Sequence, residues 1–93
     1  MKEPSGIYKS NVDDSIFVVF GGKIALTIDN DNEHQYLVMF ELKDQTNIGS
    51  EVDSSMINSD CPPVALAFND VSSINLIIKT LERIKHNLIK ENK

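Results

Sequence analysis

The stretch of sequence that decides the fold is "SIFVVFGGKIALTID", residues 15–29, in which two apolar segments flank a pair of glycines. The first segment is rich in β-branched and aromatic residues, which is typical of a strand. The second segment alternates apolar with polar residues and predicts a strand with Ile24, Leu26 and Ile28 on one face. Because glycine reaches positive φ at little steric cost, Gly21-Gly22 predicts a two-residue hairpin between the two strands.

Further strands and one helix follow this hairpin. The segments "QYLVMFELK" (35–43) and "PVALAFND" (63–70) alternate apolar and polar residues and predict two more strands. Residues 71–90 predict one long helix, with Asp70 as its N-cap because a carboxylate there accepts from a free amide of the first turn.

Two segments have no clear periodicity. Residues 1–14 are mostly polar and predict either a frayed tail or a short edge strand. Residues 44–63 form a long polar loop, and structureless loops of that length are uncommon in a compact domain. Either a short irregular strand lies around residues 50–57, or the loop is functional or mobile.

The predicted helix is amphipathic. Its apolar residues follow alternating three- and four-residue spacing and form one stripe, which we call the helix stripe: Ile74, Ile77, Leu81, Ile84 and Leu88. Its basic residues fall on the opposite side, and we call them the basic ridge: Lys79, Arg83, His86 and Lys90. The stripe predicts that the helix lies on an apolar sheet, with the ridge pointing outward.

These elements predict a single α+β domain over residues 1–93. The predicted architecture is an antiparallel β-meander of four to five strands with one C-terminal α-helix packed across one face. A chain of this length is marginally stable alone, because it buries only about 60–65% of its unfolded surface. Dimerisation would therefore help it.

The first strand is apolar on both sides, which leaves a second apolar face. In the predicted hairpin this face carries Ile16, Val18, Phe20 and Ala25, which Leu37 and Met39 join from the third strand. One helix covers only one side of a sheet. The second face therefore predicts an interface, most simply that of a homodimer, unless the N-terminal segment or the 44–63 loop covers it.

Charge is divided unevenly along the chain. Residues 1–70 carry a net charge of −8 and residues 71–93 a net charge of +3, which together give the total of −5. An acidic body argues against general nucleic-acid binding, which depends on phosphate contacts. The start of the chain has no apolar run and no stretch is long enough to cross a membrane, so we expect a soluble cytoplasmic protein.

The sequence offers no motif for metal or cofactor chemistry. Asp29, Asp31 and Glu33 resemble part of a calcium loop, but His34 and Phe40 stand where such a loop has Gly and Glu. A turn built from residues that cap their own backbone is the other interpretation. Cys61 has no histidine placed by a motif to activate it. We therefore expect no metal, no cofactor and no enzymatic activity.

The sequence alone thus predicts a non-enzymatic protein-interaction module. By analogy of size and charge only, this could be a small inhibitor of a larger machine, of the anti-defence or immunity type. One alternative is a small-ligand binder or sponge with a pocket at a dimer interface. Another is an acidic nucleic-acid mimic. The surfaces that could meet a protein partner are the second sheet face, the basic ridge, and four loop carboxylates: Asp44, Glu51, Asp53 and Asp60.

Overall fold

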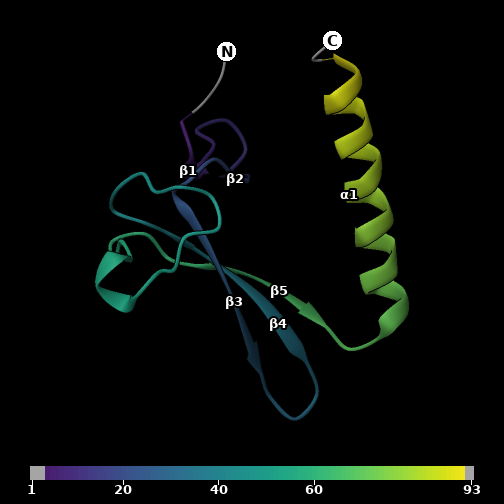
Figure 1. Cartoon of the computed structure of the whole chain (residues 1–93). Helices are drawn as coiled ribbons and strands as arrows, with labels where there is room; N and C mark the ends of the chain where they lie inside the picture. The colour runs from purple at the N-terminus through teal and green to yellow at the C-terminus, as the bar shows by residue number, and fades with distance from the viewer. Residues whose placement is uncertain (1–3, 92–93) are drawn as a thin grey trace.

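The computed structural model describes residues 4–91, which form five strands, one short 3-10 turn and one helix (Figure 1). The elements are β1 (Gly6–Lys9), β2 (Ile16–Val19), β3 (Ile24–Asn30), β4 (Gln35–Glu41), the 3-10 turn (Ser54–Met56), β5 (Val64–Phe68) and α1 (Val71–Glu91). All strand pairs are antiparallel. The predicted α+β class, with antiparallel strands followed by a C-terminal helix, is confirmed.

The strands form two sheets rather than one meander. β1 pairs with β2, and a separate three-stranded sheet has the order β3-β4-β5. Within the segment 1–14, the structure has the short strand rather than a frayed tail, and residues 1–3 lie outside the described range. β2 pairs with β1 and β3 with β4, and the strands β2 and β3 do not pair with each other.

The predicted Gly21-Gly22 hairpin is therefore wrong. The two glycines have φ of 154° and 114° and carry the chain from one sheet to the other. The Gly22 carbonyl accepts from both the backbone N–H and the Oγ1 of Thr46, at 2.8 Å and 2.7 Å. A Cβ at position 22 would collide with Gln45 and with the Thr46 carbonyl. Glycine is thus needed here for the close approach of another segment, not for a tight turn.

Polar contacts join the two sheets. The Ser5 hydroxyl donates to the Val19 carbonyl (2.9 Å) and accepts from the Lys23 N–H (3.0 Å). The Ile7 N–H donates to a carboxylate oxygen of Glu41 at 3.0 Å. This bond, helped by the nearby Lys23 charge, holds the pKa of Glu41 below its usual value despite partial burial.

The buried core of the described residues is small. Only Leu42, Met39 and Ala25 among the apolar side chains are classed as buried, and Leu42 is 1% exposed. Leu42 pairs with Ile57 in an isolated bridge, and its N–H donates to the Lys23 carbonyl at 2.8 Å. The core therefore lies at the end of β4, where the 44–63 loop returns to the sheet.

That loop is partly ordered by its own hydrogen bonds. Asp53 caps the 3-10 turn by accepting from the Ser55 N–H at 3.0 Å. The Lys43 N–H donates to the Met56 carbonyl at 2.9 Å, and the Asn58 N–H donates to the Glu41 carbonyl at 2.8 Å. The loop thus contains a short turn and one bridge to the sheet, rather than a further strand.

The helix begins as predicted but does not cover the sheet. Asp70 accepts from the Ser73 N–H at 2.6 Å, which is the expected cap. Beyond its first turn, α1 stands apart from the strands (Figure 1), and Leu81 and Leu88 are each 56% exposed. The prediction that the helix packs across one face of the sheet is therefore wrong in its packing, although the helix itself is present.

The helix is also much longer than the strand that precedes it. The 21 residues of α1 extend for about 31 Å at the helical rise per residue. The five residues of β5 extend for only roughly 17 Å. The connection Asn69-Asp70 is short and sets the direction of the helix at the end of β5. The radius of gyration is consequently 14.8 Å, whereas a compact domain of this length has about 12 Å.

We expect Leu42→Ala to lower the free energy of unfolding by about 2–5 kcal/mol, because it empties the centre of the core. Leu81→Ala is the matched control and should cost about 0.5 kcal/mol or less, because the side chain is exposed. Urea unfolding at a concentration where the chain is monomeric measures both. Equal losses for the two variants would contradict the observed position of the core.

We also expect Glu41→Ala to loosen the contact between the two sheets. The substitution removes the acceptor for the Ile7 N–H, so that amide should exchange with solvent on the order of tenfold faster. Hydrogen exchange followed by NMR measures this rate. The amide of Leu42, which donates to Lys23, serves as the control and should keep its protection; unchanged exchange at Ile7 would rule out the bond.

Candidate functional site

The helix stripe is an extended apolar surface that the strands leave largely uncovered. Ile74, Leu81, Ile84 and Leu88 are between 38% and 56% exposed, and Ile77 is half-buried. Only the first turn meets the sheet, where Val71 and Ile74 line a shallow depression with Phe68. Ile78 and Ile89 widen the stripe and are also exposed, and they were not singled out from the sequence.

One face of the three-stranded sheet is also apolar. The strand register places Leu26, Met39 and Val64 side by side, and Ile28, Leu37 and Leu66 in the next row. Within this face Met39 is buried, whereas Ile28 is 80% exposed. The prediction that Leu37 and Met39 lie on the opposite side from Ile24, Leu26 and Ile28 is therefore wrong, because the β3–β4 register pairs Leu26 with Met39 and Ile28 with Leu37.

The residues of the predicted second apolar face do not form one continuous exposed patch. Ile16 and Val18 lie on β2, in the two-stranded sheet, and Ile16 is exposed. Ala25 lies on β3 in the other sheet and is buried, which removes it from any exposed patch. Phe20 follows β2 and is exposed, but it lines a groove beside β3 instead. The predicted patch is divided because β2 and β3 belong to different sheets.

This groove lies between the 46–57 part of the loop and the strands β3 and β4, next to the cross-strand pair Ala25 and Phe40, and has a volume of about 640 Å³. Its apolar lining includes Phe20, Ile24, Leu26, Phe40, Ile48 and Val52. The 44–63 loop is thus one wall of an apolar groove, a role that the sequence did not indicate because its apolar residues are isolated among polar ones.

All four side chains of the basic ridge are exposed to solvent: Lys79, Arg83, His86 and Lys90. Among residues 4–91, none of these four has a carboxylate within ion-pair distance, since the ion pairs found there join Lys9 to Asp14 and His34 to Asp31. The helix therefore carries an uncompensated positive side opposite its stripe.

The four loop carboxylates do not form a site of their own. Asp44, Glu51, Asp53 and Asp60 are all exposed. The Asp53 carboxylate caps the 3-10 turn, and hydrogen bonds from Ser55 lower the pKa of Asp53. Within residues 4–91, no group of three or more His, Cys, Asp or Glu side chains is placed to hold a metal ion.

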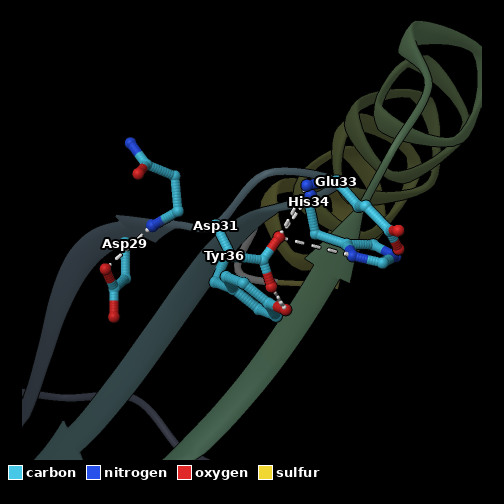
Figure 2. Close-up of polar contacts among 6 residues, drawn as sticks. Asp29, Asp31, Glu33, His34 and Tyr36 are labelled. Atoms are coloured by element: carbon cyan, nitrogen blue, oxygen red, sulfur yellow. Dashed lines mark hydrogen bonds and ion pairs between the residues drawn. The ribbon is translucent and has the colours of Figure 1, made fainter.

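The 29–34 segment forms the turn of the β3–β4 hairpin, as the second interpretation of that segment predicted. Asp31 organises it: one carboxylate oxygen accepts from the N–H groups of Glu33 (2.8 Å) and His34 (2.7 Å) (Figure 2). Its other oxygen accepts from the Tyr36 hydroxyl at 2.5 Å. These bonds use the oxygen atoms that a calcium ion would need.

Hydrogen bonding also sets the ionisation of this turn. The bond from Tyr36, followed by those from Glu33 and His34, lowers the pKa of Asp31 to about 2. The same bond raises the pKa of Tyr36. Since the Asp31 pKa is lower in the folded chain, its stabilising effect is present above the ordinary value of 3.8 and is lost as the pH falls toward 2.

Cys61 lacks the environment of a nucleophile. Burial, followed by the adjacent Glu41 carboxylate, raises the pKa of its thiol. A thiol of raised pKa is protonated at neutral pH, and the thiolate is the reactive form. The residue is half-buried and fits a structural role.

Comparison with known proteins adds no functional assignment: no family model, no curated protein and no solved structure matches the chain. Over residues 4–91, no helix is both long enough and apolar enough to cross a membrane.

We expect the Asp31 carboxyl to titrate near pH 2 in a carbon-detected NMR titration. Tyr36→Phe removes the largest cause of this shift, so the pKa should rise toward 3.8. Asp29 lies in the same segment and is the internal control for general charge effects. An Asp31 pKa near 3.8 in the unmodified chain would show that these hydrogen bonds are absent in solution.

Proposed function

We propose that the chain is a protein-interaction module that binds an apolar groove of another protein through the helix stripe of α1. The observation that carries this proposal is the exposure of that stripe on a helix which its own sheet does not cover. Amphipathic helices bind in this way, with side chains at three- and four-residue spacing entering the partner's groove.

The total surface supports the same conclusion. The accessible surface is 7768 Å², whereas a compact monomer of 10.4 kDa has about 5,400 Å². The excess of roughly 2,400 Å² exceeds the ~800 Å² per partner of a standard interface. A chain that leaves so much surface uncovered gains stability when a partner covers it.

Charge defines the chemistry of the partner. The stripe belongs to residues 71–93, which have a net charge of +3, while residues 1–70 have a net charge of −8. A groove with an acidic rim would attract this basic segment and repel the rest of the chain, which favours one orientation of binding. The partner is therefore a protein with an apolar groove and acidic residues at its rim.

The proposed module acts by contact, without chemistry of its own. The raised pKa of Cys61 and the engagement of Asp31 in its turn leave neither group poised for catalysis. Of the four loop carboxylates only Asp53 lines the groove, and it caps the 3-10 turn, so no observation favours a nucleic-acid mimic. Whether the bound protein is inhibited is a property of that protein.

The test is affinity capture from the native host with three forms of the tagged chain. Leu81→Gln places an amide within the helix stripe, whereas Leu76→Gln places the same group on the other side of the same helix, where Leu76 is 65% exposed, and neither variant changes the charge of the helix. We expect a protein that the wild-type chain and Leu76→Gln retain and that Leu81→Gln loses. The purified pair should bind on the order of tenfold more weakly with Leu81→Gln, since a buried amide left unpaired costs about 1–3 kcal/mol.

The salt dependence gives an independent check on the acidic rim. Attraction between the basic helix segment and an acidic rim should weaken between 50 and 300 mM salt, on a scale set by a screening length of about 8 Å at physiological strength. If Leu81→Gln and Leu76→Gln capture the same proteins in the same amounts, the stripe is not the binding surface and the proposal fails.

A further inference from the structure

The outer edge of β3 is an unpaired strand edge. β3 pairs with β4 on one side only. The Lys23 carbonyl faces β4, where it accepts from Leu42, so by strand alternation Ala25, Thr27 and Asp29 also direct their backbone groups to β4. The backbone groups of Ile24, Leu26 and Ile28 therefore point outward; within residues 4–91, no hydrogen bond to them is found on that side.

Backbone groups at both ends of this edge already have hydrogen-bond partners. At the start of the edge, the N–H and the hydroxyl of Thr46 both donate to the Gly22 carbonyl. After it, the Asn30 N–H is taken by the Asp29 side chain at 2.8 Å. What remains open is the stretch from Ile24 to Ile28, beside the apolar groove that Phe20 helps to line.

The open stretch lacks the usual protection of an edge strand. Proteins block such edges with lysine, proline, a bulge or a very short strand. "IALTI", residues 24–28, has neither lysine nor proline, and its pairing with β4 is continuous. β5, at the other edge, is shorter and is preceded by Pro62-Pro63. The edge of β3 is therefore the one suited to accept another strand.

We propose that a second copy of this chain pairs antiparallel with β3, with Leu26 opposite the partner's Leu26 on a two-fold axis. In this register Ile24 lies opposite the partner's Ile28, so the centre of the pairing is apolar. Lys23 then lies opposite the partner's Asp29, and the symmetry repeats this pair of opposite charges at the other end. The two three-stranded sheets become one continuous six-stranded sheet.

The chain itself selects this register. A shift toward Gly22 places the incoming strand on the segment that Thr46 already occupies. A shift toward Asn30 places it against the 31–34 turn that Asp31 holds. The Leu26-centred register aligns Lys23–Asp29 with its copy, and the two strands diverge beyond this stretch, because the copy's Asn30 would otherwise meet Thr46 at Gly22.

The pairing leaves the helix stripe free. α1 follows β5, at the opposite edge of the three-stranded sheet from β3. The excess surface of roughly 2,400 Å² per chain is enough for a standard interface of ~800 Å² per partner and a second binding surface. The dimer is therefore independent of the helix-mediated function proposed above, and each can fail without the other.

The first test is the mass in solution, by sedimentation equilibrium of the full chain. We expect a dimer at high micromolar concentration. Leu26→Pro removes an outward N–H that the chain does not use internally, so it should give a folded monomer. Leu26→Ala keeps that N–H and should still dimerise. Circular dichroism of each variant, and protection of the Leu42 amide, establish that the fold is retained.

The second test uses charge reversal and does not depend on proline. Lys23 and Asp29 are about 20 Å apart along one strand, so they interact only across the dimer. K23E alone and D29K alone set like charges opposite each other at both ends and should weaken dimerisation on the order of tenfold. An equimolar mixture of the two variants sets opposite charges at both ends and should restore it.

A monomeric wild-type chain at high micromolar concentration overturns the dimer. A dimer that Leu26→Pro leaves intact and that mixing the charge variants does not affect overturns the β3 edge as its interface. A monomer that still captures a partner through Leu81 overturns the dimer alone. Loss of the helix-dependent partner with an intact dimer overturns the proposed function alone. An extended peptide from another protein at the β3 edge would show as a monomer whose Leu26 amide gains protection only with that protein.

Discussion

The structure depends on the closure of the β3–β4 ladder around Leu42. Its backbone N–H holds the start of β3 through Lys23, and its pairing with Ile57 brings the loop back to the sheet. The neighbouring Glu41 holds β1 through the Ile7 amide. One fully buried leucine thus marks the point at which both sheets and the loop meet, and the remaining apolar surface lies outside it.

The residues that form the buried core are different from those that lie exposed on α1 and on the three-stranded sheet. A core of few side chains suffices to fix the strand order, and it leaves α1, one sheet face and the β3 edge available to other molecules. The two proposed binding surfaces represent different recognition modes, an amphipathic helix and an open strand edge. They lie at opposite edges of the three-stranded sheet, so a dimer through β3 would present two helices to partners and raise their apparent affinity by multivalency.

Local patterns in the sequence predicted the elements well, but not how they assemble. Alternation and three-to-four spacing identified β3, β4, β5 and α1, and Asp70 was correctly expected to cap the helix. The failure lay at Gly21-Gly22, since a glycine pair is compatible both with a hairpin and with the close approach of Thr46. Only the tertiary structure distinguishes these, and the predicted patch that combined β2 with β3 depended on that choice.

The candidate surfaces show the same limit. The helix stripe and the basic ridge could be predicted, because both follow from helical periodicity alone. The groove beside β3 could not, because it brings Phe20 and Ile24 together with Ile48 and Val52 from a loop without periodicity. The stripe was expected to cover the sheet, since an amphipathic helix normally lies on its own domain, and here the helix is too long and too sharply connected to do so.

The most direct measurement of the central claim is hydrogen exchange along α1 in the dilute, monomeric chain. If the helix has no partner within its own chain, amides from Ile78 to Leu88 should exchange nearly as fast as in an isolated helix, which is marginally stable in water. Amides of β4 should be far better protected. Protection of α1 equal to that of β4 would contradict the account, because it would mean that the helix is docked on its own sheet.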